Sequence, residues 1–314
     1  MPARILVIKL GALGNVVLSF RPFAAIRDHH RDAEITLLTT APYADWMKRS
    51  PWFDRVWIDD RPAWWDARAW LNLRRRLLNG GFDRVYDLQT SARTFRYFQM
   101  LPRRWRPEWS GIAAGCSHPD RNPARDTLHD IDRQIGQLRQ AGIVEMPEPD
   151  LSWCTGCIGR FALPPRVTLL VPGSSAHRPI KRWPVEHYRE LAAHLHEHGT
   201  HPVVLGSAAE HELARAIQVS TPATDLTGHT TFGDLAALAR SAMLAVGNDT
   251  GPMHLIAATG SPTLVLFSRD SDPALCAPRG PSVTVLRRPD LATLDAETVS
   301  KTAVELLSTS ADAA

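Results

Sequence analysis

Short apolar runs alternate with longer amphipathic stretches along the first half of the chain. The apolar runs predict strands at residues 5–9, 34–39, 55–58 and 84–88. The amphipathic stretches predict helices at residues 15–29, 42–49, 66–79, 91–100 and 127–141. Strands that alternate with helices over short connections favour a parallel sheet covered on both faces.

The second half repeats this alternation after a segment rich in proline and glycine at residues 142–166. Its predicted strands lie at residues 167–171, 202–205, 244–246 and 263–267, and its predicted helices at 184–198, 209–219, 232–241, 252–259 and 294–307. We therefore expect an α/β protein with two doubly wound, Rossmann-like domains facing a cleft. The domain limits that we predict are 1–150 and 166–314, joined by a linker at 151–165. In such sheets ligands bind at the carboxyl ends of the strands.

The stretch "LAVGNDTGPMHLIAATG" places polar residues directly after a predicted strand. Thr250 and Gly251 precede a helix whose first N–H groups and dipole favour a phosphate. Asp249 stands beside them, and His254 lies one turn into the helix. These residues predict a phosphate site, with a simple helix cap formed by Asp249 or Thr250 as the alternative.

A second strand end, "PGSSAHRPIKRWP", combines hydroxyl groups with cations. Ser174 and Ser175 follow the strand, and Lys181 and Arg182 precede the next helix. Hydroxyls, backbone N–H groups and a lysine together make a second anion-binding set, as a diphosphate needs. The alternative is a basic surface loop.

A third strand end carries a carboxylate, Glu210, shortly after Gly206 and Ser207. A carboxylate in this place can accept hydrogen bonds from a ribose, as in dinucleotide-binding folds. The alternative is an acidic residue that the helix dipole favours at the N-terminus of a helix.

Composition and charge narrow the class of protein. The chain has 314 residues, of which 44% are hydrophobic and 22% charged, as in ordinary globular proteins. It shows neither an apolar run of about 18 residues nor a signal-peptide pattern, so we expect a cytoplasmic protein. Residues 1–150 hold 23 Lys and Arg against 18 Asp and Glu, while the remainder is slightly acidic. The arginine-rich first half indicates an anionic partner there, unless these charges only solvate the surface.

Several motifs fall short of a cofactor or metal site. Cys154 and Cys157 form a single CxxC, which we interpret as two thiols in a connecting segment. His196-Glu197 begins a zinc-protease pattern, but Thr200 stands at the place of its second histidine. The chain lacks a Walker loop and a complete Rossmann glycine fingerprint. We interpret Trp64, Trp65 and Trp70 as packing residues and not as a surface for nucleic-acid bases. From all these motifs together we expect no cofactor, metal or nucleic acid.

Taken together, "KRWPVEHYRELA", "VVLGSAAEHE", "DLTGHTT" and "GNDTGPMHLIAA" resemble glycosyltransferase family 9, the ADP-heptose:lipopolysaccharide heptosyltransferases, in order and spacing. The resemblance covers nearly the whole chain. It implies a GT-B fold and an inverting transfer of a heptose or related sugar from an ADP-sugar to a lipopolysaccharide core acceptor. The donor would bind the second domain and the anionic, lipid-linked acceptor the first, with peripheral contact at the inner membrane face and no obligatory metal.

The resemblance also assigns roles to single residues. The positions that match the family's donor site are Ser174, Ser175, Lys181, Glu210, Thr230, Asp249, Thr250, Gly251 and His254. Lys181 would contact the phosphates and the sugar, Glu210 the ribose, and Thr230 would lie near the base.

Asn15 departs from the family pattern. After the first strand the family has Gly-Asp, whose aspartate would be the catalytic base, whereas this chain has Gly14-Asn15. An amide cannot take a proton from the acceptor hydroxyl at neutral pH, although it can orient that hydroxyl. Three explanations stay open: an impaired enzyme, another base nearby, or a deliberate Asp→Asn change. The alternative functions are a nucleotide-sugar-binding homologue that has lost its base and a GT-B nucleotide-sugar epimerase.

Overall fold

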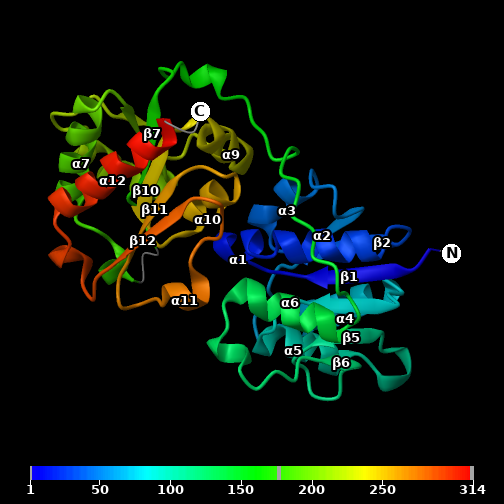
Figure 1. Cartoon of the computed structure of the whole chain (residues 1–314). Coiled ribbons are helices and arrows are strands. Elements are labelled where there is room, and N and C mark those ends of the chain that lie inside the picture. The colour runs from blue at the N-terminus through cyan, green and yellow to red at the C-terminus, as the bar shows by residue number, and fades with distance from the viewer. Residues whose placement is uncertain (1, 175–177, 312–314) are drawn as a thin grey trace. The chain divides into compact units, whose positions relative to one another are not determined.

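The structure, a computed structural model, describes residues 2–174 and 178–311. The chain divides into two compact units, Met1–Trp153 and Cys154–Ala314. We call them the first and the second unit. Each contains one six-stranded sheet in which every neighbouring pair of strands is parallel, with helices packed on it (Figure 1).

The sheet of the first unit has the strand order β3-β2-β1-β4-β5-β6. Its strands are β1 Arg4–Ile8, β2 Glu34–Thr39, β3 Arg55–Ile58, β4 Arg84–Asp87, β5 Glu108–Gly111 and β6 His118–Pro119. Its helices are α1 Leu13–Val17, α2 Phe20–His29, α3 Ala41–Met47, α4 Ala67–Asn79, α5 Ala92–Met100 and α6 Asp130–Gln140, with 3₁₀ turns at Arg103–Trp105 and Arg125–Thr127.

Two layers of helices cover this sheet. Leu6 and Ile8 of β1 point to one face, where they share a buried cluster with residues of α4 and α5 such as Leu73 and Tyr97. The helices α2 and α6 contact each other. Residues i and i+2 of a strand share a face. Because helices cover both faces of the sheet, β1 is apolar and buried from Ile5 to Ile8.

The sheet of the second unit has the order β12-β11-β10-β7-β8-β9. Its strands are β7 Val167–Val171, β8 His201–Val204, β9 Thr224–Asp225, β10 Leu244–Asn248, β11 Thr263–Phe267 and β12 Val283–Arg287. Its helices are α7 Val185–Glu197, α8 His211–Gln218, α9 Phe232–Ser241, α10 Gly251–Ala258, α11 Pro273–Cys276 and α12 Ala296–Ala311, with 3₁₀ turns at Gly159–Phe161, Pro179–Lys181, Ala208–Glu210 and Leu291–Thr293.

Trp183 joins the layers of the second unit. Its ring is buried next to Tyr188 of α7, and its Nε1 donates a hydrogen bond of 2.7 Å to the carbonyl of Leu294, just before α12. The helices α7 and α12 pack against each other over Leu170, Val246 and the other apolar residues of the sheet. This core fixes the segment before α7, which carries Lys181.

The proline- and glycine-rich segment is fixed by side-chain contacts at several points along its length. Trp153 makes edge-to-face ring contacts with Phe20 and Trp52 of the first unit. In the second unit the guanidinium of Arg160 pairs with Asp234 of α9 at 2.7 Å, and a Cβ on Gly156 would clash with the backbone of Asp234. The segment is therefore held by specific contacts where the sequence predicts a linker.

The cysteines of this segment form no disulfide in the part of the chain that the structure describes. Cys154 is buried against the carbonyl of Phe232, and Cys157 is exposed. Among the described residues, no group of three or more His, Cys, Asp or Glu is arranged to hold a metal ion. Within the same residues, no helix is long and apolar enough to cross a membrane.

The structure corrects several element predictions. The single helix expected at 15–29 is two helices, because the chain turns at Leu18 and Ser19 between α1 and α2. The short strands β5, β6, β9 and β12 were not predicted: β6 and β9 have two residues each and lie at sheet edges, and β5 is a four-residue strand that contains glycine. Strand β10 runs on to Asn248, two residues beyond the predicted end.

The interpretation of the tryptophans as packing residues is correct for Trp70 and wrong for two others. Trp70 lies against the ring of Tyr97, and its Nε1 donates to the carbonyl of Ala63. Trp64 and Trp65 leave 77% and 71% of their surface exposed.

Candidate functional site

Three neighbouring strands of the second unit end at the same edge of its sheet. The strands β10, β7 and β8 are adjacent and parallel, so the segments that follow them lie side by side. These segments carry Ser174 after β7, Glu210 after β8, and Asp249 with Thr250 after β10. The three sets of candidate residues that the sequence predicts are thus brought to one edge.

An ion pair connects two of these sets. The Lys181 Nζ lies 2.6 Å from Asp249 Oδ2, and the two side chains are only 12% and 8% exposed. The ammonium group has three N–H donors, so the Asp249 carboxylate occupies one and the others can bind phosphate oxygens. Asp249 is therefore suited to orient Lys181, because a carboxylate in direct contact with a phosphate would repel it.

Asn248 holds this arrangement together, and the sequence analysis did not single it out. Its side chain is completely buried. The Nδ2 donates to the carbonyl of Pro172 at 2.7 Å, and the Oδ1 accepts from the backbone N–H of Trp183 at 3.1 Å. Asn248 thereby ties the end of β10 to both ends of the segment that carries Lys181. The only signal in the sequence is a polar residue closing an apolar strand.

The N-terminus of α10 begins directly after Asp249. Thr250 is its N-cap residue, yet its side chain makes no capping hydrogen bond, so the alternative of a Thr250 cap does not hold. His254, one turn in, is buried. A Cβ on Gly247 would lie 2.5 Å from Met253 Sδ and 2.8 Å from Val171 Cβ. Only glycine at this position lets α10 pack so closely on β7 and β10.

Ser174 and Arg182 form the part of the site after β7. The Arg182 Nη2 donates to the carbonyl of Ser174 at 3.0 Å. The buried Ser174 Oγ and Arg182 Nε have no hydrogen-bond partner among residues 2–174 and 178–311. Buried polar groups are nearly always paired, so these two are suited to a bound anion. Ser175, which was predicted beside Ser174, lies outside the described residues.

Glu210 lies over the ends of β7 and β8. Its Oε2 accepts hydrogen bonds from the N–H and the Oγ of Ser207, at 2.8 and 2.6 Å, in a capping box. The side chain also runs so close to the strand ends that a Cβ on Gly173 or Gly206 would approach it within 3 Å. Glu210 therefore caps a turn at the ends of β7 and β8.

Thr230 follows a turn that is fixed to the same edge. The N–H of Gly228 donates to the carbonyl of Gly206 at 2.9 Å, which anchors the turn beside the end of β8. Thr230 is partly exposed and stands between this turn and the N-terminus of α9.

Asn15 lies on α1, at the carboxyl edge of the first unit's sheet, and its side chain is exposed. A buried polar chain holds this helix. The Ser19 Oγ lies 2.8 Å from both the carbonyl of Asn15 and Gln134 Oε1, and Gln134 Nε2 donates to Asp130 Oδ2. Asp130 in turn faces the buried ammonium of Lys9. The Asn15 amide is therefore presented from a helix that α6 holds in place.

A buried carboxyl and a buried amine lie behind the same edge. Burial raises the pKa of Asp87 to about 6, and burial lowers the pKa of Lys9. Asp87 Oδ1 accepts from the N–H groups of Gln89 and Thr90, and Lys9 Nζ donates to the carbonyl of Leu88. Asp87 is only 1% exposed, so its carboxylate holds the loop after β4 and does not face solvent as a base for a substrate would.

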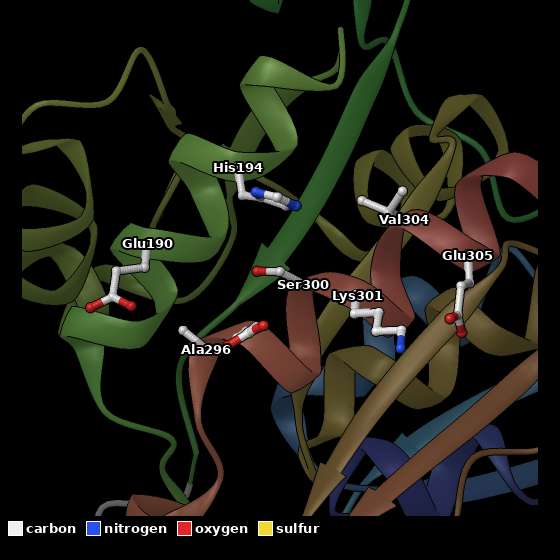
Figure 2. Close-up of a pocket in the computed structure, with 8 residues that line it drawn as sticks. Glu190, His194, Ala296, Ser300, Lys301, Val304 and Glu305 are labelled. Carbon is white, nitrogen blue, oxygen red and sulfur yellow. The ribbon is translucent and has the colours of Figure 1, made fainter.

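A separate groove lies on the helices of the second unit. Figure 2 shows it between α7 and α12, lined by Glu190, His194, Ser300, Lys301 and Glu305 among others, with a volume of about 520 Å³. None of the predicted donor residues lines it.

Comparison with known proteins identifies the chain. The model of glycosyltransferase family 9 (heptosyltransferase) matches residues 70–303. The chain belongs to this family. It is therefore a glycosyltransferase, and its two parallel sheets with their helices form a GT-B fold.

Curated and solved members of the family align over most of the chain. It is 22% identical over 289 residues to the lipopolysaccharide core heptosyltransferase OpsX of Haemophilus influenzae. This alignment covers 85% of this chain and 79% of OpsX. A family 9 glycosyltransferase from Veillonella parvula superposes with a TM-score of 0.83 at 23% identity and covers 97% of both chains. The E. coli heptosyltransferase WaaC, solved with ADP, superposes with a TM-score of 0.76 at 21% identity, over 96% of this chain and 99% of WaaC.

Proposed function

We propose that this family 9 enzyme transfers a heptose or a related sugar, with inversion, from an ADP-sugar to a lipopolysaccharide core acceptor. The observation that carries the proposal is the buried Lys181–Asp249 pair beside the N-terminus of α10 and the unpaired Ser174 Oγ, at one edge of the second unit's sheet. The names of its relatives support the sugar and the acceptor, since OpsX is a lipopolysaccharide core heptosyltransferase and WaaC was solved with ADP.

The donor residues act on the diphosphate, which is the leaving group. As the acceptor oxygen bonds to the anomeric carbon, the bond from that carbon to the phosphate oxygen breaks and negative charge grows on the ADP. The proton of the acceptor hydroxyl passes to water or to a base other than Asn15. In this proposal Lys181 and the N–H groups at Gly251 would stabilise this charge without a metal. Ser174 and Ser175 would bind phosphate oxygens, and Asp249 and Thr250 would hold the Lys181 ammonium and the helix start in position.

The remaining donor residues fit the sugar-nucleotide on either side of the diphosphate. Glu210 would accept hydrogen bonds from the ribose hydroxyls, and Thr230 would lie near the base. His254, buried in the first turns of α10, would face the donor sugar or its phosphate. We further propose that the lipid-linked acceptor binds the arginine-rich first unit, that the protein is cytoplasmic, and that it contacts the inner face of the membrane.

Asn15 is the reason to consider a second candidate function. If the acceptor binds at the carboxyl edge of the first unit, the Asn15 amide can orient its hydroxyl but cannot take its proton. A homologue that binds the nucleotide sugar without transferring it would carry the same donor site and this same amide. Acceptor-dependent release of ADP separates the two candidates.

Calorimetric titration with ADP tests the donor site. Lys181→Ala removes a charge-assisted contact worth about 1.5–3 kcal/mol, so the affinity for ADP should fall at least about tenfold. Lys301→Ala is the matched control, because Lys301 belongs to the same unit but lines the groove of Figure 2. Equal ADP affinities of the Lys181→Ala variant and the unmodified protein would refute this donor site.

A further inference from the structure

Three tryptophans of the first unit are exposed to solvent. Trp64, Trp65 and Trp105 leave 77%, 71% and 66% of their surface accessible, and no other tryptophan within the described ranges is exposed to this degree. Large aromatic side chains contribute most to stability when they are buried, so a group of exposed ones marks an interaction surface.

These tryptophans lie at the two ends of one continuous surface. A groove of about 650 Å³ between α4 and α5 is lined by Trp64, Leu71, Arg96 and Met100, and a second of about 480 Å³ by Leu77, Phe82, Leu101 and Trp105. The α4 residues of both grooves recur every three or four positions, so they form one stripe along that helix. We call this surface the tryptophan face: Trp64, Trp65, Leu71, Trp105 and the two grooves.

The tryptophan face is strongly basic. Residues 61–107 contain eleven arginines and three acidic residues. Arg96 lines the first groove, and Arg103 and Arg104 directly precede Trp105. The guanidinium of Arg104 lies 5.6 Å from the centre of the Trp105 ring. These three arginines are exposed and form no ion pair with the residues that the structure describes.

We propose that the tryptophan face docks the protein on the surface of an anionic phospholipid bilayer. Tryptophan is enriched at the level of lipid headgroups because its ring is apolar and its N–H is polar. Clustered arginines are attracted to the negative potential of anionic lipids. Exposed tryptophans surrounded by unpaired arginines combine both forms of recognition, and the grooves add apolar surface along α4.

Docking through the tryptophan face would serve the proposed sugar transfer. Trp64 and Trp65 follow β3, so they lie at the same edge of the parallel sheet as α1 with Asn15. The Arg61 Nη2 contacts the carbonyl of Leu10, in the loop that leads to α1, at 3.4 Å. A docked protein would hold this edge close to the headgroups, where the sugars of a lipid-linked acceptor lie. This use rests on the proposed function, whereas bilayer binding itself does not.

Flotation of the full-length protein with vesicles that contain no acceptor tests the proposal. We expect binding to vesicles of phosphatidylethanolamine with phosphatidylglycerol and much weaker binding to phosphatidylcholine alone. The double substitutions Trp64→Ser with Trp65→Ser and Arg103→Glu with Arg104→Glu should each lower partitioning into the anionic vesicles by about tenfold or more. ADP affinity should not change in either variant, because the donor residues belong to the second unit.

Matched controls test whether vesicle binding depends on the tryptophan face or only on the net charge and exposed apolar surface of the whole protein. Arg121→Glu with Arg139→Glu makes the same change in net charge at two exposed arginines near the end of α6, and Val144→Ser removes a side chain that is 66% exposed. Both should keep most of the vesicle binding.

The proposal would be overturned if the protein did not bind anionic vesicles, or if the control variants lost as much vesicle binding as the variants of the tryptophan face. Two further results would also overturn it: vesicle binding only after lipopolysaccharide acceptor is added, or a dimer that the tryptophan substitutions dissociate. The last two would assign the face to the acceptor site or to a second copy of the chain. Vesicle binding without ADP binding would instead refute the proposed function and leave the docking surface intact.

Discussion

At the scale of single residues, the candidate donor site depends on pairs that are distant in sequence. Lys181 and Asp249 are 68 positions apart, and Asn248 joins Pro172 to Trp183. The sequence predicted most members of the site because strand ends and helix starts are visible in its pattern. It could not predict that Asp249 binds Lys181, since that contact depends on how β7 and β10 pair in the sheet.

The Lys181–Asp249 pair predicts a ligand-dependent stability. Asp249→Asn leaves the partly buried Lys181 ammonium without its counter-charge. Breaking a fully buried pair costs about 3–5 kcal/mol, so we expect a smaller loss here. We expect a lower melting temperature without ligand and a larger stabilisation by ADP than in the unmodified protein, because the diphosphate supplies the missing negative charge. Thermal melts with and without ADP measure both effects. Equal melting temperatures and equal ADP shifts would show that the pair does not form.

Asn15 gives the second prediction at this scale. General-base catalysis is typically worth about 10²–10⁴-fold in rate, so Asn15→Asp should raise sugar transfer by a factor in this range. The rate should also gain an acidic limb in its pH profile, while ADP affinity stays the same because the donor residues lie in the second unit. Asn15→Leu, which cannot orient a hydroxyl, serves as the control. A rate that the aspartate does not increase would mean that another residue is the base.

At the scale of secondary-structure elements, segments with a clear apolar run were predictable even when short, whereas the two-residue edge strands were not. The strands β2, β3, β7 and β11 and the helix α9 have the predicted bounds. The two-residue strands at the sheet edges carry no pattern of their own, since they form only because a neighbouring strand offers hydrogen bonds. The break between α1 and α2 follows from the Ser19 hydroxyl, which turns toward Asn15 and Gln134.

The end of β4 predicts a pH-dependent stability. Burial raises the pKa of Asp87 from 3.8 to about 6, so between these values the folded protein keeps a proton that the unfolded chain has lost. Its contribution to the free energy of unfolding therefore decreases as the pH rises from about 4 to 6, by up to about 3 kcal/mol. Asp87→Asn should flatten this part of the profile, as measured by urea unfolding across that range. Parallel profiles of the two proteins would contradict the assignment.

At the scale of the whole molecule, the chain contains two similar units with different surfaces. The pattern of the sequence predicted two doubly wound parallel sheets, and the structure confirms them. The tryptophan face was not predicted, because an apolar residue in a turn looks the same in the sequence whether it packs inward, or faces solvent as Trp64, Trp65 and Trp105 do. In this account the second unit binds the donor, and the first presents Asn15 and the tryptophan face.

The most direct test of this account is a transfer assay with ADP-heptose and a lipopolysaccharide core acceptor that lacks its next heptose, analysed by mass spectrometry. We predict that the acceptor gains one heptose for each ADP released, that Asn15→Asp accelerates this step, and that Lys181→Ala suppresses it. An acceptor left unmodified by both the Asn15 protein and its Asn15→Asp variant, although both bind ADP-heptose, would contradict the account.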